Sequence, residues 1–183
     1  MKKTSLLALM MCTLPSMTMA HNLTVGETIP AASVAKHGEL MLEGDKIAYQ
    51  AWDSANLTGK VRVVQAIAGR KSAKKLNAPL IDAIIAAELP NDKYQTTTVI
   101  NQDDAMWGTS SFVKSSAEDS KKEFNWSSIV LDKDGTAFKA WELAEESSAI
   151  FVVDQQGTVL FAKEGALTEA EISQVLATVE QNL

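Results

Sequence analysis

The chain has 183 residues, a formal net charge of −6 and one cysteine, Cys12. This length suits a single domain with a substantial hydrophobic core. The acidic charge argues against a nucleic-acid-binding protein and against general attraction to anionic membranes. One cysteine cannot close an internal disulfide, so the core must hold the domain together.

Residues 1–20 have the pattern of a secretory signal peptide. Two lysines begin the segment, a short apolar run follows over residues 6–14, and small residues lead up to Ala20. The run is too short to span a membrane. We expect cleavage after Ala20 and a single periplasmic domain over residues 21–183, with no cysteine and no membrane insertion. Cleavage removes two of the 17 Lys and Arg residues and none of the 23 Asp and Glu residues, which changes the net charge from −6 to −8.

A lipoprotein anchored through Cys12 is the alternative interpretation of the same segment. Lipid attachment requires a small residue before the modified cysteine, whereas the bulky Met11 stands there in this chain. This mismatch favours the cleaved signal peptide.

The first part of the expected mature chain predicts a loose β-hairpin. Residues 29–34 have an extended pattern, His37-Gly38 indicates a turn, and residues 39–42 provide the returning strand. The segment after the hairpin is expected to be a connection that packs two aromatic residues, Tyr49 and Trp52, on the core.

The middle of the chain predicts a strand–helix–strand unit. Residues 61–68 are mostly apolar, as in a strand of a parallel sheet that is covered on both faces. Ser72 is expected to cap the following helix, and Pro79 is expected to kink it. Residues 94–101, rich in Thr, Val and Ile, form the second strand. The apolar stripe of the helix consists of Leu76, Leu80, Ile81, Ile84, Ile85 and Ala87.

The last part of the chain predicts two helices and two hairpins. A helix is expected over residues 112–124. Hairpins are expected over residues 129–138 and 150–161, because each segment has an apolar run, an Asp-x-x-Gly turn and a returning apolar run. The final helix, over residues 168–182, begins with a Thr-x-x-Glu capping box.

This order of elements resembles the thioredoxin-like fold in its exported, peroxiredoxin-related forms. Gly59-Lys60 before a Val-rich strand is similar to the entry of the central strand in that group. Thioredoxins have a helix-kinking proline eight residues after the first redox cysteine, and Pro79 stands eight residues after Lys71. The resemblance implies an α/β domain with a central mixed β-sheet flanked by helices and an N-terminal hairpin extension.

Three stretches resemble the YtfJ family of exported, thioredoxin-like bacterial proteins of unknown function. They are GKVRVVQAIAGR, YQTTTVIN and WELAEESSA, which begin at residues 59, 94 and 141. The resemblance implies a location in the periplasm of a Gram-negative bacterium and a thioredoxin-like fold. It supplies no reaction.

The redox chemistry of that fold is missing from this chain. Thiol–disulfide exchange requires a thiolate, usually at a helix N-terminus. The resemblance places the Cys-x-x-Cys motif on residues 71–74, which read Lys-Ser-Ala-Lys. The cis-proline of the superfamily would fall on residues 146–149, which contain no proline. We therefore expect neither thiol–disulfide oxidoreductase nor peroxidase activity.

A basic cluster marks the start of the same helix. Its members, together with the small polar residue between them, are Arg70, Lys71, Ser72, Lys74 and Lys75. Free backbone N–H groups and the helix dipole favour an anion at this position. The cluster predicts a site for an anionic small molecule or for an acidic segment of a periplasmic partner protein. The alternative is a helix start whose long side chains are simply solvated.

Polar residues follow the second predicted parallel strand: Asn101, Gln102, Asp103 and Asp104. Ligands of open α/β sheets bind at this carboxyl edge, and carboxylates can ligate a hard cation. The alternative is a polar loop that caps the next helix. Residues 132–135 have a slight likeness to a calcium loop, but a hairpin turn is the better interpretation because the later acidic ligands are missing.

Other candidate residues have weaker patterns. His21 would become the N-terminus and could chelate copper with His37, but two histidines alone carry no site, and no metal or other cofactor is predicted. Ser147 and Ser148 have no motif that would make either a nucleophile. The tryptophans at 107, 126 and 141 are expected to lie in the core or at its rim.

Three functions remain open at this stage. The first is a non-catalytic binding or interaction module on the thioredoxin active-site surface. The second is a thiol-independent enzyme that uses Lys71 or Lys74 with carboxylates at the sheet edge. The third is a subunit of a complex. A buried lysine with a lowered pKa would favour the enzyme, solvated lysines would favour binding, and a large exposed apolar patch would favour the complex.

Overall fold

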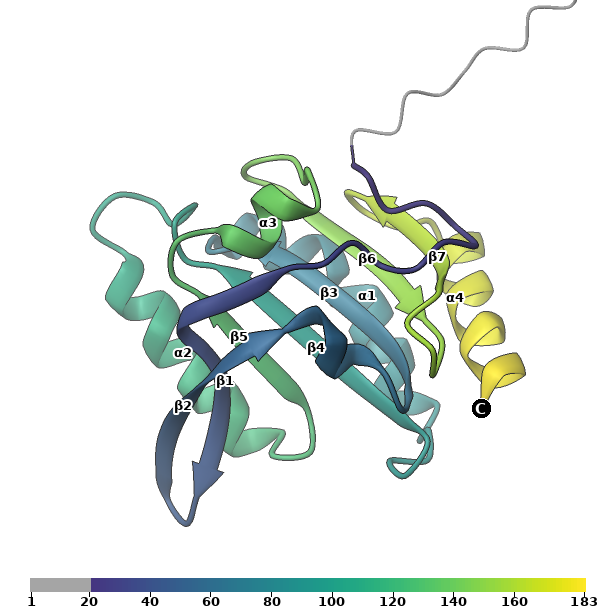
Figure 1. Cartoon of the computed structure of the whole chain (residues 1–183), viewed down its shortest axis with the longest axis horizontal. Helices are drawn as coiled ribbons and strands as arrows, with labels where there is room; N and C mark the ends of the chain where they lie inside the picture. The colour runs from purple at the N-terminus through teal and green to yellow at the C-terminus, as the bar shows by residue number, and fades with distance from the viewer. Residues whose placement is uncertain (1–20) are drawn as a thin grey trace, which may run out of the picture.

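The computed structural model describes residues 21–183, so the predicted signal peptide lies outside the described residues. A seven-stranded mixed sheet of order β2-β1-β5-β4-β3-β6-β7 crosses the molecule (Figure 1). Its strands are β1 (Ser33–Glu43), β2 (Lys46–Asp53), β3 (Val61–Ala68), β4 (Tyr94–Asn101), β5 (Ser128–Asp132), β6 (Ser148–Val153) and β7 (Val159–Glu164). The helices are α1 (Lys71–Ala86), α2 (Ser110–Glu123), α3 (Thr136–Ala140) and α4 (Glu169–Asn182), with the 3-10 turn η1 (Ser54–Leu57).

The central strand β3 has neighbours on both edges. It pairs in parallel with β4 and antiparallel with β6, and β4 pairs in parallel with β5. Every residue of β3 except Gln65 is buried. The predicted bounds of β3 and β4 are confirmed, because an uninterrupted apolar run is the pattern of a strand covered on both faces.

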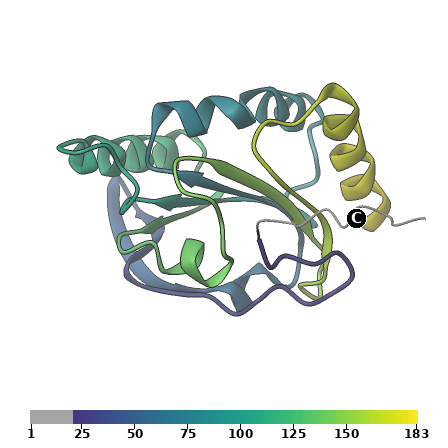
Figure 2. The ribbon, with the colours of Figure 1, turned by 90° about the horizontal axis from the view of Figure 1, so that it is seen from above.

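Helices cover both faces of the sheet, as predicted (Figure 2). Helices α1, α2 and α4 lie on one face, and α3 lies on the other with the N-terminal segment. The second face holds a core that joins Leu23, Trp52, Val64, Trp141 and Phe151, among others. Within residues 21–183, none of the helices combines the length and the apolar character needed to cross a bilayer.

The predicted N-terminal hairpin is displaced. Strand β1 continues through His37-Gly38, where a register irregularity interrupts its pairing with β2, and the turn lies at Gly44-Asp45. Gly38 has a φ of 77°, and a Cβ there would lie 2.1 Å from the carbonyl oxygen of Gln50. The turn-like residues therefore make a bulge within a strand, where backbone approaches backbone. The segment after the hairpin, which was expected to be an irregular connection, forms β2 and η1. Trp52 is buried there and Tyr49 is half-buried.

The prediction of a hairpin over residues 129–138 is wrong. Strand β5 ends at Asp132 and is followed by helix α3. The Asp132 carboxylate is buried and accepts hydrogen bonds from Ala137 N at 2.8 Å and Thr136 Oγ1 at 3.1 Å. A returning strand has no edge to pair with, because β1 and β4 already occupy both edges of β5. The hairpin over residues 150–161 is confirmed as β6 and β7.

The start of α1 also differs from the prediction. The helix begins at Lys71, with Arg70 at the N-cap position, and no side chain caps it. Ser72 therefore lies inside the first turn and does not cap the helix. Pro79 lies within the helix, as expected, whereas Ile85 is exposed and does not belong to the apolar stripe. The second predicted helix corresponds to α2.

The predicted capping box of α4 is confirmed in both directions. Glu171 N donates to Thr168 Oγ1, and Thr168 N donates to Glu171 Oε2. Lys163 Nζ donates to both oxygens of the same carboxylate at 2.5 Å. The bonds from Lys163 and then from Thr168 lower the pKa of Glu171 from 4.5 to about 2.

This lowered pKa predicts a pH-dependent contribution to stability. A carboxyl group with a depressed folded-state pKa stabilises the fold above its unfolded pKa, and the contribution is lost as the pH falls through the folded value. We expect Glu171→Gln to lower the melting temperature at pH 7, and the difference from the unaltered protein to shrink between about pH 4.5 and pH 2. Thermal unfolding followed by circular dichroism measures it. Glu180→Gln, on an exposed residue of the same helix, is the control; equal behaviour of the two variants would contradict the prediction.

Candidate functional site

Two of the predicted site segments meet at one edge of the sheet. The turn after β3 contacts the loop after β4, where Gly69 N donates to Asn101 O at 2.8 Å. A Cβ on Gly69 would lie 2.8 Å from that oxygen and 3.2 Å from the Ala105 side chain. Glycine is therefore required for this close approach. The contact sets the start of α1 directly beside the loop that carries Asp103 and Asp104.

Arg70 ties three segments together at this edge. Its guanidinium pairs with Asp104 Oδ1 at 2.9 Å and with Glu146 Oε1 at 3.0 Å, and its Nε donates to Asp104 O at 2.9 Å. The Asp104 side chain is 8% exposed, and its other oxygen accepts a hydrogen bond from Glu146 N. Two carboxylates thus neutralise Arg70, so it differs from the rest of the predicted basic cluster.

The three lysines of the cluster are solvated. Lys71, Lys74 and Lys75 are exposed on the first turns of α1, and none of them forms a salt bridge within residues 21–183. The first turn of α1 contains no acidic residue and has no side-chain cap. Ser72 is exposed among them. The positive end of the helix and three ammonium groups therefore face the solvent together.

Asp103 lies on the other side of the loop. Its carboxylate pairs with Lys139 of α3 at 3.2 Å. Asp103 and Asp104 line a hollow of about 220 Å³ at the carboxyl end of β4, with Asn101, Phe138, Lys139, Glu142, Leu143 and Glu145. Among the described residues, no group of three or more His, Cys, Asp or Glu side chains could hold a metal ion. The structure thus offers no support for the cation that this loop suggested.

The other metal suggestions find no support either. His21 is buried, and its Nδ1 accepts a hydrogen bond from Leu23 N at 3.2 Å. His37 lies in β1 against Tyr49, with 5.1 Å between the ring centroids. The carboxylate of Asp132 is used to hold the start of α3, which is not the geometry of a calcium loop.

A buried chain of polar side chains beneath α1 was missed by the sequence analysis. Asn77 is fully buried, donates to Gln65 Oε1 at 3.3 Å and accepts from Ser148 Oγ at 3.0 Å. Gln65 in turn donates to Thr98 Oγ1 at 3.0 Å. This network of hydrogen bonds ties α1 to β3, β4 and β6. Its one signal in the sequence is a polar residue seven positions before Ile84, on the buried side of the helix.

Asn77→Ala is expected to cost about 1–3 kcal/mol of folding stability, because it leaves Gln65 Oε1 and Ser148 Oγ without partners in the core. Urea unfolding measures the loss. Asn56→Ala, at an exposed position, is the matched control and should change stability by less than about 0.5 kcal/mol. A double variant with Ser148→Ala that shows simple additivity would contradict the shared network.

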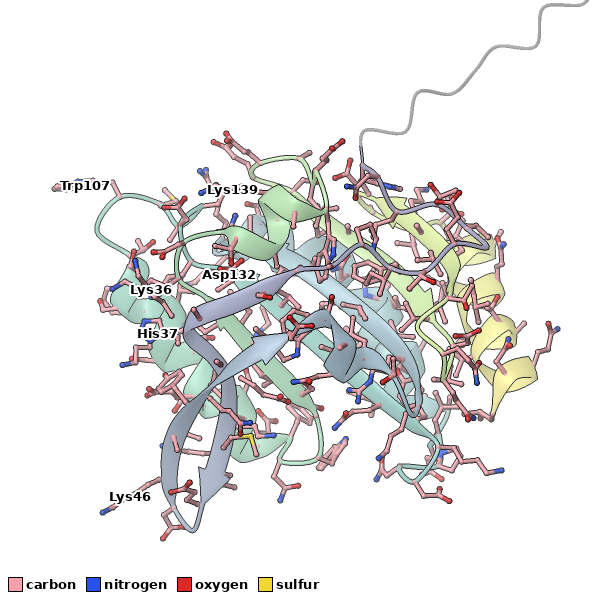
Figure 3. All side chains as sticks on the ribbon, viewed as in Figure 1. Lys36, His37, Lys46, Trp107, Asp132 and Lys139 are labelled. Atoms are coloured by element: carbon pink, nitrogen blue, oxygen red, sulfur yellow. The ribbon has the colours of Figure 1, made fainter. Side chains whose placement is uncertain are left out.

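Large apolar side chains are exposed just beyond Asp104. Met106 is 61% exposed, Phe112 is 74% exposed, and Trp107 is fully exposed and points away from the body of the protein (Figure 3). The prediction that Trp107 belongs to the core or its rim is therefore wrong, because the loop extends past the end of the sheet. Trp126 is half exposed, and Trp141 is buried, as expected. We call Met106, Trp107 and Phe112 the apolar knob.

Comparison with known proteins now places the chain. A family model described as a bacterial protein of unknown function, YtfJ, matches residues 23–182. The chain belongs to the YtfJ family. It is 49% identical over 178 residues to the uncharacterised protein YtfJ of Escherichia coli, covering 97% of each chain. It is 45% identical over 164 residues to an uncharacterised protein of Haemophilus influenzae, covering 90% of this chain and 89% of that one.

Solved structures show that this YtfJ-family chain has a thioredoxin-like fold. A candidate protein disulfide isomerase from Bacteroides thetaiotaomicron superposes with a TM-score of 0.60 at 13% identity, covering 89% of this chain and 92% of that chain. The thioredoxin domain of a thiol-disulfide oxidoreductase from Bacteroides vulgatus gives 0.56 at 15% identity, with coverage of 85% and 96%. These identities establish the fold alone. Lysines stand at positions 71 and 74, where the resemblance places the two redox cysteines. The cis-proline of the superfamily has no counterpart in the described residues, because none of their peptide bonds is cis.

Proposed function

We propose that this YtfJ-family chain is a non-catalytic periplasmic module that binds an acidic segment of a partner protein. The binding face consists of the apolar knob and the exposed lysines at the start of α1. The observation that carries the proposal is the exposure of the knob beside an uncapped, lysine-bearing helix start. The two parts are linked through an ion pair, because Arg70, which precedes Lys71, pairs with Asp104, two residues before Met106.

The apolar knob supplies the first reason. Tryptophan and methionine are enriched at protein interfaces, and a buried tryptophan is a frequent source of binding energy. Burying one such side chain contributes about 1.5–3 kcal/mol relative to leaving it in water. A fully exposed Trp107, with the exposed Met106 and Phe112 close to it in the sequence, therefore favours a partner with an apolar pocket.

The lysines supply the chemistry of the partner. Lys71, Lys74 and Lys75 carry three positive charges on a chain whose overall charge is negative. Such a local reversal of sign attracts an acidic segment and aligns it, and the attraction weakens with salt. The free N–H groups of the first turn of α1 can also donate hydrogen bonds to carboxylate oxygens.

The solvation of these lysines argues against the enzyme alternative. A lysine that acts as a base or nucleophile needs a lowered pKa, which requires burial or a neighbouring cation in a dry site. Lys71 and Lys74 are exposed, and no carboxylate of residues 21–183 lies within salt-bridge distance of either. The carboxylates of the sheet edge are paired elsewhere, Asp104 with Arg70 and Asp103 with Lys139.

The proposed binding can be tested by site-specific crosslinking in cells. A photoreactive amino acid placed at position 107 should crosslink a distinct partner. Lys71→Glu with Lys74→Glu should abolish that adduct, because an acidic segment would then be repelled. Trp126→Ser, which removes an exposed tryptophan elsewhere, is the matched control and should leave the adduct unchanged. An adduct that survives the charge reversal, or the absence of any adduct at position 107, would refute the proposed face.

The periplasmic location rests on the first twenty residues and on the start of the fold. His21 is buried and Leu23 lies in the core, so the residue that the expected cleavage would place at the N-terminus is packed against the domain. Fractionation followed by N-terminal sequencing should give a periplasmic protein that starts at His21. Ala20→Arg should leave the precursor uncleaved, because signal peptidase requires a small residue there, whereas Ala8→Leu should be processed normally. A cytoplasmic protein that keeps Met1 would contradict this prediction.

A further inference from the structure

The hollow at the carboxyl end of β4 has both apolar and charged lining side chains. It has a volume of about 220 Å³ and is formed by the loop after β4, by α3 and by the segment after α3. Two of its lining residues are apolar: Phe138 is 4% exposed and Leu143 is half-buried, and both belong to the core of that face of the sheet. The volume is below the roughly 300–1,000 Å³ of pockets that take drug-sized ligands, so it suits a single side chain.

Carboxylates outnumber cations around this hollow. Lys139 is the one basic residue in its lining. Of the four lining carboxylates, those of Asp103 and Asp104 are each held by a basic side chain. The other two belong to Glu142 and Glu145, which are exposed and form no salt bridge within residues 21–183. Two carboxylates are therefore left for a cation that enters the hollow.

Asn101 gives the same hollow an unused donor. The residue is 6% exposed, and its Oδ1 accepts hydrogen bonds from Asp103 N at 3.1 Å and Asp104 N at 3.3 Å, which fixes the orientation of the amide. Its Nδ2 donates to no group within residues 21–183, and it is not among the partnerless atoms that are sealed from solvent. A nearly buried donor without a protein partner favours a ligand that brings an acceptor oxygen.

A basic residue within a peptide has all the groups that this lining calls for. Its aliphatic stem can lie on Phe138 and Leu143, as the stems of lysine and arginine commonly do on apolar surface. Its charged end can then meet the free carboxylates of Glu142 and Glu145. Its backbone carbonyl oxygen can accept from Asn101 Nδ2. A metal ion needs several ligands at one point, whereas this extended organic cation can use groups spread around the hollow.

We propose that this hollow binds a lysine or arginine residue of the partner segment whose acidic residues meet the lysines of α1. The inference rests on the proposed function and adds a second, opposite charge to the partner. The two places are linked, because Asp104 lines the hollow and pairs with Arg70, which precedes Lys71. Figure 3 shows Lys139 of the hollow and Trp107 of the apolar knob along the same edge of the molecule. Opposite charges at the two places fix the direction in which the segment lies.

The test is a titration of the isotopically labelled protein with acetyl-Gly-Lys-Gly-amide and its arginine counterpart, followed by NMR. The side-chain amide signal of Asn101 should shift saturably with at least one of them. The norleucine peptide, which keeps the stem without the charge, should bind about tenfold more weakly, and so should n-butylammonium, which lacks the carbonyl. No saturable shift with either basic peptide, or equal binding of the norleucine peptide, would overturn the proposal. Equal binding of n-butylammonium would overturn the role of Asn101.

A pair of substitutions assigns the binding to this hollow. Glu142→Gln with Glu145→Gln removes both free carboxylates at exposed positions and should abolish the saturable shift. Glu123→Gln with Glu180→Gln, at exposed positions of α2 and α4, is the matched control and should leave the shift unchanged. A basic peptide that binds the first double variant as tightly as the unaltered protein would refute the assignment.

Crosslinking from position 107 separates this inference from the proposed function. Glu142→Gln with Glu145→Gln should lower the yield of the partner adduct about tenfold. An adduct that is lost in Lys71→Glu with Lys74→Glu but unchanged in the glutamine variant would support the partner-binding face and refute the hollow. Absence of any adduct would refute the partner-binding face, and the peptide titration would still decide whether the hollow takes a basic residue.

Discussion

The burial of β3 between two hydrogen-bonded neighbours is the constraint on which the rest of the structure depends. The strand is hydrogen-bonded to β4 on one edge and to β6 on the other, and side chains pack on both of its faces. Its place and its register in the sheet are therefore fixed. Its carboxyl end must turn sharply into α1, and Gly69 permits this turn to touch the loop after β4. The start of α1, the β4–α2 loop and the start of β6 therefore meet at one edge of the sheet.

The charges at that edge divide into two groups with different roles. Arg70 and Lys139 are used internally, because Asp104, Glu146 and Asp103 hold them. In the part of the chain that the structure describes, the lysines at the start of α1 have no such partners, and they face the solvent. The fold is thioredoxin-like, yet the helix start that carries thiolates in redox proteins carries ammonium groups here. A thiolate would support exchange chemistry, whereas the proposed recognition of an acidic segment rests on the solvated ammonium groups.

The sequence predicted those parts of the fold whose signals are local. The apolar run of β3, the β-branched run of β4 and the capping box of α4 each depend on residues close together in the chain, and all three are confirmed. The hairpin predicted at Asp132 failed for a non-local reason. An Asp-x-x-Gly segment can begin a turn or a helix, and the choice is made by β1 and β4, which leave no edge for another strand.

The sequence by itself determined what the candidate site lacks and what charge it carries, since residues 71–74 contain no cysteine and have lysines at positions 71 and 74. Only the tertiary structure decided which charges are available. Arg70 is paired because Asp104, 34 positions away, is brought to it, and Glu142 and Glu145 come to line one hollow with residues of the loop after β4. Solvation and pairing depend on neighbours in space, which no local periodicity encodes.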